Sequence, residues 1–87
     1  MISVVKKEGD TFEVTVKGAT TTTHVLTLTA DDKERLVPGD VTKEALIEKS
    51  FEFLLERESN TMILRQFDLM VIQRYFPEYT TVIKKMF

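Results

Sequence analysis

One uninterrupted segment, residues 42–58, constrains the fold more than any other part of the chain. Its apolar residues recur at helical spacing and neither glycine nor proline interrupts it, so it predicts a long helix with Thr42 as N-cap. The apolar side chains spread over roughly 200° of the helix surface, wider than the stripe of a helix that lies on one core. The helix must therefore be covered from two sides. Its apolar residues are Leu46, Ile47, Phe51, Phe53, Leu54 and Leu55.

Before this helix, the chain predicts a three-stranded antiparallel meander. Residues 2–8 and 11–17 are rich in β-branched side chains and flank Gly9-Asp10, a two-residue connection typical of a type II′ hairpin. Such a tight turn fixes the register and would set Val5 opposite Val14 on the buried face. In the second strand, the side chains expected on that face are Phe12, Val14 and Val16.

A third strand is expected at residues 20–29, and the length of the loop before it decides which side chains are buried. A two-residue loop would expose Leu26 and Leu28, whereas a loop of three or five residues would bury both. Because each buried leucine stabilises the fold by about 1.5–3 kcal/mol, we expect the odd loop. The same register turns the only histidine of the chain, His24, toward the core.

Residues 30–41 are expected to be a polar connection between the sheet and the helix. They contain a run of charged residues at 31–35 and then the turn signal Pro38-Gly39. After the central helix, Ser59-Asn60 is expected to stop the helix with a residue in the left-handed conformation. Residues 62–67 would then form a short turn.

Two short elements are expected near the end of the sequence. Asp68 is a good N-cap for a helix that Pro77 ends. For residues 79–87 two interpretations stay open, because the apolar spacing favours a helix while the β-branched residues 80–83 also suit a strand. The first helix would carry Leu69, Ile72, Tyr75 and Phe76 on one side. The helical pattern of the last segment is formed by Tyr79, Val82, Ile83 and Met86.

These elements predict a single α+β domain of 87 residues. Its parts are the meander (1–29), the connection (30–41), the central helix (42–58) and two or three short helices (59–87). The composition, 43% hydrophobic and 30% charged, is typical of a folded domain. Cysteine is absent, no apolar run approaches about 20 residues and no signal-peptide pattern is present, so we expect a cytoplasmic protein without a membrane anchor.

Three motifs stand out along the chain: His24-Val25-Leu26, the segment SFEFLLERE at residues 50–58, and the pattern FDLxxIxxYFPEY at residues 67–79. Together they resemble a family of short uncharacterised prokaryotic proteins, a domain of unknown function. The resemblance implies a compact domain from a prokaryotic source. It implies no activity, substrate or catalytic residue, since none is assigned to that family.

The chain contains no catalytic, metal or cofactor motif of any specificity. Gly-rich phosphate loops and the GxSxG and HExxH motifs are absent, and the acids of residues 31–34 lack the spacing of an EF-hand loop. His24 has no identifiable partner for acid-base catalysis, so we interpret it as a hydrogen-bonded core residue, with a role in a site as the alternative. We therefore expect a non-enzymatic domain with no cofactor.

Two surfaces are candidates for binding a partner. The first is a ridge of four acids on the central helix, where like charges repel. A solvated face, pairing with Arg65 or Arg74, or a basic partner would each account for the ridge. The second is a C-terminal apolar stripe, which would have too little core left to cover it and would be buried in a homodimer or against another protein. The ridge consists of Glu44, Glu48, Glu52 and Glu56, and the stripe of Tyr79, Val82, Ile83, Met86 and Phe87.

Nucleic-acid binding is the alternative function. The aromatic residues of segment 75–79 lie close in sequence to Arg74, Lys84 and Lys85, an arrangement that suits stacking on a single strand. However, the formal net charge is -2 and no RNA-binding signature is present, so nucleic acid is a disfavoured partner. The sequence thus favours a protein-interaction or regulatory module that associates with itself.

Overall fold

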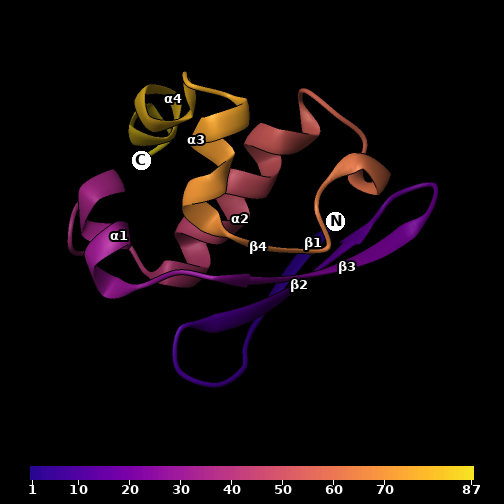
Figure 1. Ribbon diagram of the computed structural model, residues 1–87, viewed down its shortest axis with the longest axis horizontal. Coiled ribbons are helices and arrows are strands. Elements are labelled where there is room, and N and C mark those ends of the chain that lie inside the picture. The colour runs from indigo at the N-terminus through magenta and orange to yellow at the C-terminus, as the bar shows by residue number, and fades with distance from the viewer.

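A four-stranded mixed sheet forms one layer of the computed structural model, which describes all 87 residues (Figure 1). Strands β1 (Ile2–Lys6), β2 (Thr11–Lys17) and β3 (Thr21–Thr27) make the expected antiparallel meander. A fourth strand, β4 (Gln66–Asp68), lies parallel to β3 at the edge opposite β1. The α+β class is confirmed, but a pure three-stranded meander is wrong, because the chain returns to the sheet after the central helix.

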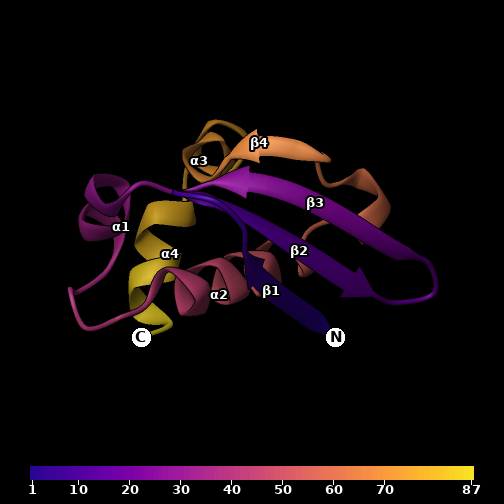
Figure 2. The ribbon, with the colours of Figure 1, turned by 90° about the horizontal axis from the view of Figure 1, so that it is seen from below.

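The helices lie on one side of the sheet (Figure 1), and the longest of them, α2, contacts both β1 and α4 (Figure 2). The core is therefore enclosed between the sheet and a layer of helices. The helices are α1 (Ala30–Leu36), α2 (Lys43–Leu55), α3 (Ile72–Tyr75) and α4 (Tyr79–Lys85), with 3₁₀ turns η1 (Asn60–Met62) and η2 (Leu69–Val71).

The first hairpin differs from the expected register by one residue. Val4, not Val5, lies opposite Val14, because the loop has three residues (8–10) instead of two. Gly9 adopts a φ of +56°, the left-handed conformation that such a loop uses at little cost. The slip exchanges the two faces of β1, so that Val5 is 51% exposed. Two apolar side chains of β1, Ile2 and Val4, pack against the core as a result.

The register of β3 is confirmed. The loop before it has three residues (18–20), and His24 lies opposite Val14 while Leu26 lies opposite Phe12. His24 and Leu28 are both fully buried and Leu26 is 1% exposed, as the odd loop requires. The buried face of β2 is also confirmed, with Phe12, Val14 and Val16 all in the core.

The connection between sheet and central helix contains a helix where the sequence predicts only a polar connection. Helix α1 begins after Thr29, whose Oγ1 accepts a hydrogen bond of 3.1 Å from the backbone N of Asp32. The acidic residues in its first turn interact favourably with the positive end of the helix dipole. Only Leu36, 2% exposed, anchors this helix in the core, so the segment lacks the apolar periodicity that would have revealed it.

Helix α2 has the predicted start and a shorter end. Thr42 Oγ1 accepts from the backbone N of Ala45 at 3.0 Å, which confirms the N-cap. The helix ends at Leu55, and the left-handed stop expected at Ser59-Asn60 is wrong, because no residue other than glycine has a positive φ. The two-sided cover is confirmed by the full burial of Leu46, Ile47, Phe51 and Phe53.

The chain after α2 passes through η1 and then extends into β4, where a short turn had been expected. Asp68 is confirmed as a cap, since its Oδ1 accepts from the backbone N of Met70 at 2.9 Å. The 3₁₀ turn η2 and helix α3 follow, with Ile72 buried. Tyr75 was expected on the same buried side but is 64% exposed.

Candidate functional site

The acidic ridge of α2 does not form the ion pairs that were considered for it. Glu52 lies 3.5 Å from Lys49, and Glu56 lies 3.5 Å from Arg57. Neither Arg65 nor Arg74 takes part in a salt bridge, so pairing of the ridge with those residues is wrong. Glu44 and Glu48 are exposed, and the ridge forms a largely solvated face.

The C-terminal stripe is a helix, α4, and its central residues belong to the core. Tyr79 and Ile83 are fully buried, so the expectation that this stripe lacks cover is wrong for both. The Tyr79 hydroxyl lies 2.6 Å from Ser50 Oγ on α2, and burial raises the pKa of Tyr79 to about 12. Val82 and Met86 are half-buried, and Phe87 at the end of the stripe is 45% exposed.

His24 occupies the core and has both ring nitrogens engaged. A carbonyl oxygen can only accept, so the bond of 2.8 Å between His24 Nδ1 and Leu64 O places the proton on Nδ1. Nε2 then accepts from Thr22 Oγ1 at 2.9 Å. Burial lowers the pKa of His24, partly opposed by the Leu64 bond, and Arg65 lowers it further. These contacts support a structural histidine.

The hydrogen-bond chain from His24 continues to Asn60, at the start of η1. Asn60 Nδ2 donates to Thr22 Oγ1 at 3.0 Å and to the Thr20 carbonyl at 2.7 Å. The segment 60–64 is thereby tied to β3 at both of its ends, by Asn60 and by the Leu64 carbonyl. Core polar groups thus fix the path of an exposed segment.

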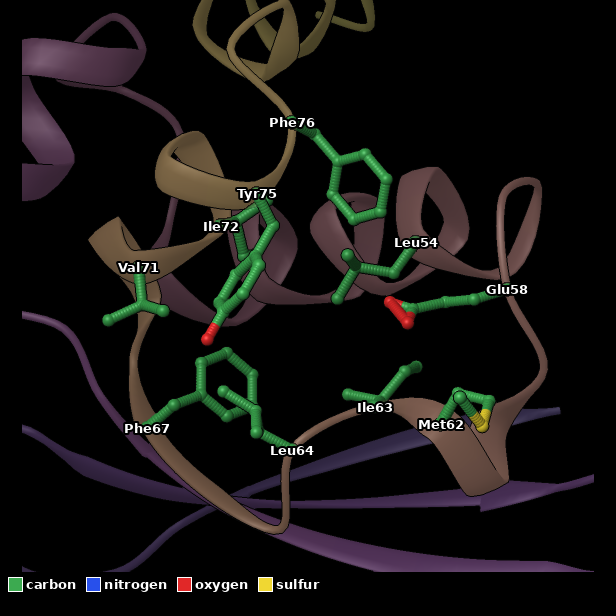
Figure 3. A pocket seen from close by; sticks show the side chains of 10 residues that line it. All are labelled: Leu54, Glu58, Met62, Ile63, Leu64, Phe67, Val71, Ile72, Tyr75 and Phe76. Atoms are coloured by element: carbon green, nitrogen blue, oxygen red, sulfur yellow. The ribbon is translucent and has the colours of Figure 1, made fainter.

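This segment forms one wall of an apolar groove (Figure 3). The opposite wall comes from the end of α2 and from α3, and Phe67 of β4 lies between the two walls. Nine of the ten lining residues are apolar, and the cavity volume is about 180 Å³. The groove is open to solvent at its rim, where large apolar side chains remain exposed: Met62 at 70%, Leu64 at 46% and Tyr75 at 64%.

Glu58 is the one charged residue of the groove. Its carboxylate extends between Leu54 and Ile63, into the space that the other side chains enclose (Figure 3). It forms no salt bridge, and no hydrogen bond reaches its side chain. Loss of solvent raises the pKa of Glu58, because burial disfavours the charged form. The groove therefore combines an apolar lining with one unpaired acid.

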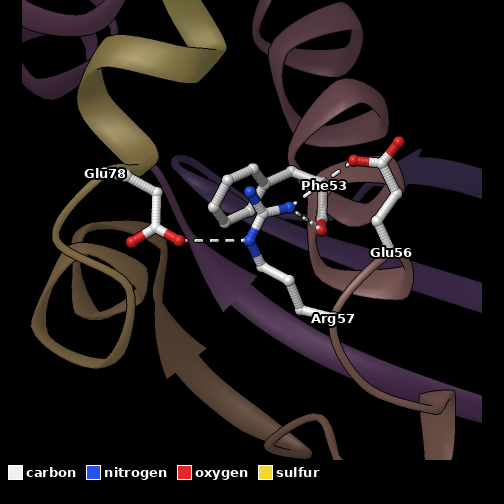
Figure 4. Close-up of polar contacts among 4 residues, drawn as sticks. All are labelled: Phe53, Glu56, Arg57 and Glu78. Carbon is white, nitrogen blue, oxygen red and sulfur yellow. Dashed lines mark hydrogen bonds and ion pairs between the residues drawn. The ribbon is translucent and has the colours of Figure 1, made fainter.

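The neighbouring cation, Arg57, is committed to other partners (Figure 4). Its guanidinium carbon lies 3.6 Å from the ring centroid of Phe53, a cation–π contact. Nε donates to Glu78 at 3.3 Å and Nη1 donates to the Phe53 carbonyl at 3.0 Å, which satisfies a free acceptor at the C-terminal end of α2. Arg57 thus fastens the end of α2 to the residue that precedes α4.

The groove was not predicted from the sequence. Residues 62–64 are three consecutive apolar residues after a polar break, which is the one local signal of an apolar surface. The sequence predicts a short turn at these residues. The sequence places Glu58 only at the last position of the central helix. Glu58 and residues 62–64 line the same groove only because the chain returns to the sheet at β4.

Comparisons of the chain with protein-family models, with curated proteins and with solved structures gave no match. The resemblance to a prokaryotic family accordingly stays a prediction from the three motifs. In the structure, no group of three or more His, Cys, Asp or Glu side chains is arranged to hold a metal ion. None of the helices has both the length and the apolar character needed to cross a membrane.

Proposed function

We propose that the protein is a small non-enzymatic interaction module that binds a partner protein in the groove between η1 and α3. The observation that carries the proposal is the exposure of Met62, Leu64 and Tyr75 around an apolar cavity. Burial of a large apolar side chain stabilises a complex by about 1.5–3 kcal/mol, so a partner that covers these residues gains affinity from each. Methionine and tyrosine are also enriched in protein interfaces.

The internal placement of His24 supports a binding role over catalysis. Both of its ring nitrogens form hydrogen bonds within the fold, one to Leu64 and one to Thr22. Neither nitrogen forms a hydrogen bond to Glu58 of the groove. A general acid or base has to reach a substrate atom through a free ring nitrogen. We propose that this binding takes place in the cytoplasm, because the sequence contains no cysteine and no signal-peptide pattern.

Nucleic-acid association is the alternative, and the charge of the groove disfavours it. Glu58 would repel phosphate groups, and the whole chain carries a formal net charge of -2.

Self-association through the C-terminal stripe is only partly supported, because Tyr79 and Ile83 already lie in the core of one chain. A second copy of the chain is the alternative occupant of the groove.

Selection from a randomised 12-residue peptide library tests the proposal. Selected peptides should bind wild-type protein and lose about tenfold or more in affinity for Leu64→Asp, which places a charge in the apolar wall. Val5→Asp is the matched control, since Val5 is similarly exposed on the outer face of β1. Fluorescence anisotropy gives the affinities and melting temperature confirms folding.

Two results would overturn the proposal: a library that yields no binders, or binders that are as sensitive to Val5→Asp as to Leu64→Asp. Sedimentation at tens of micromolar tests self-association, and a dimer that Leu64→Asp disrupts would make a second copy the occupant. Saturable, salt-sensitive binding of random DNA would favour the nucleic-acid alternative.

A further inference from the structure

We infer that Glu58 pairs with a lysine or arginine of the partner, so that the groove recognises a bulky apolar side chain next to a cation. This inference rests on the proposed function and adds the chemistry of the bound segment. It starts from the position of the Glu58 carboxylate inside an otherwise apolar groove, between Leu54 and Ile63 (Figure 3). A carboxylate in such surroundings has lost part of its solvent without gaining a partner within the fold.

The fold itself supplies no cation for this acid. Arg57 is adjacent in sequence, but its guanidinium is stacked on Phe53 and bonded to Glu78 and to the Phe53 carbonyl (Figure 4). The acid nearest in sequence at the helix end, Glu56, has a cation partner, since it lies 3.5 Å from Arg57. Glu58 itself has no counter-ion, and it is the acid that lines the groove.

Electrostatics then determine which partners fit. A cation brought to Glu58 by a partner would offset the partial loss of solvent, and the low polarity of the lining strengthens that attraction. An anionic segment would place like charges together and would be rejected. The raised pKa of Glu58 is consistent with a carboxylate that gains from a positive neighbour.

The size of the groove limits the apolar part of the ligand. An apolar cavity of about 150 Å³ can hold a molecule of benzene. The groove volume of about 180 Å³ therefore accommodates one aromatic or branched aliphatic side chain. If the bound segment is helical, a basic residue three or four positions away lies about 5–6 Å from this anchor, close enough to reach Glu58 at the same time.

The test compares the peptides selected by wild-type protein with those selected by Glu58→Gln, which keeps the shape of the side chain and removes its charge. Wild type should enrich peptides with Lys or Arg near a bulky apolar residue, and Glu58→Gln should enrich the apolar residue alone. For one selected peptide, replacing its basic residue by citrulline or norleucine should weaken binding to wild type by about two- to fivefold and leave binding to Glu58→Gln unchanged.

The control variant is Glu34→Gln, which makes the same charge change on the exposed surface of α1. It should select the same peptides as wild type. Enrichment of apolar residues without Lys or Arg would overturn this inference and leave the proposed function standing, as would a basic preference that persists in Glu58→Gln. Failure to select any peptide would overturn both.

Discussion

Folding removes part of the solvent around the Glu58 carboxylate. Its pKa is raised in the folded protein, so the folded state holds the proton more tightly than the unfolded chain does. The resulting penalty is absent below the ordinary pKa of 4.5 and grows as pH rises through the folded value. At neutral pH the charged carboxylate is therefore a cost to the isolated protein.

We accordingly predict that Glu58→Gln is more stable than wild type at pH 7, by up to about 0.5 kcal/mol after allowance for solvent screening of a partly exposed group. Near pH 4 the two proteins should converge, because Glu58 is then largely protonated in both states. Urea denaturation at the two pH values measures the difference. A variant that is less stable than wild type at pH 7 would mean that Glu58 already has a stabilising partner within the fold.

His24 gives the opposite dependence on pH. Its pKa lies below the ordinary value of 6.5, so on acidification the unfolded chain takes up a proton before the folded protein does. Stability should be fully present above about pH 6.5 and should fall as pH drops from there toward the folded pKa. An NMR titration of the His24 ring should give a midpoint below 6.5.

Replacement of His24 by leucine should cost about 1–3 kcal/mol, because the Leu64 carbonyl loses its side-chain donor in a buried site. The same variant should flatten the dependence of unfolding free energy on pH below the ordinary histidine pKa of 6.5. Chemical denaturation across this range measures both effects. An unchanged stability at pH 7 would instead point to a role for His24 outside the fold.

At the scale of elements, α4 is held to α2 by a buried pair of hydroxyls. Ser50 Oγ donates to the Leu46 carbonyl at 2.7 Å, so it accepts from the Tyr79 hydroxyl at 2.6 Å. Ser50→Ala leaves the Tyr79 hydroxyl buried without a partner and should cost about 1–3 kcal/mol. Addition of Tyr79→Phe should recover part of that loss, since both polar groups are then gone. Unfolding free energies of Ser50→Ala, Tyr79→Phe and the double variant complete the double-mutant cycle with wild type. A double variant that is less stable than Ser50→Ala would contradict this pairing.

The elements that could be predicted are those whose own residues specify them. Helix α2 has an N-cap and an apolar pattern at helical spacing, and β3 could be oriented because burial of Leu26 and Leu28 leaves one register. Strand β4 has only three residues and exists because β3 offers it an edge, which no local pattern encodes. The three-residue loop around Gly9 escaped notice because Gly9-Asp10 also suits a two-residue turn.

The groove could not be predicted from the sequence either, because no local pattern encodes contacts between separate elements. It brings Glu58 together with Leu64 and Tyr75 from separate elements, and only the return of the chain to the sheet at β4 sets them around one cavity. Sequence periodicity reports which side of an element is apolar, as it did for Ile72. It does not report which apolar side chain stays exposed.

For the whole molecule, the C-terminal helix should be required for folding. Removal of residues 79–87 takes away Tyr79 and Ile83, both fully buried, and each loss of a large core side chain costs about 2–5 kcal/mol. We expect the truncated chain to be unfolded at 25 °C by circular dichroism. A truncated chain that stays folded and monomeric would show that α4 is an accessory surface, which would return it as a candidate for self-association.

The central claim is that the groove is the binding surface, and NMR chemical-shift mapping of a selected peptide on ¹⁵N-labelled protein tests it most directly. The claim predicts that the largest shifts fall on backbone amides of residues 54–76 that surround the groove, with Glu58, Leu64 and Tyr75 among them. The amides of α1 and of the β1–β2 hairpin should change little. Shifts concentrated on α4 or on the outer face of the sheet, with the groove amides unmoved, would contradict the claim.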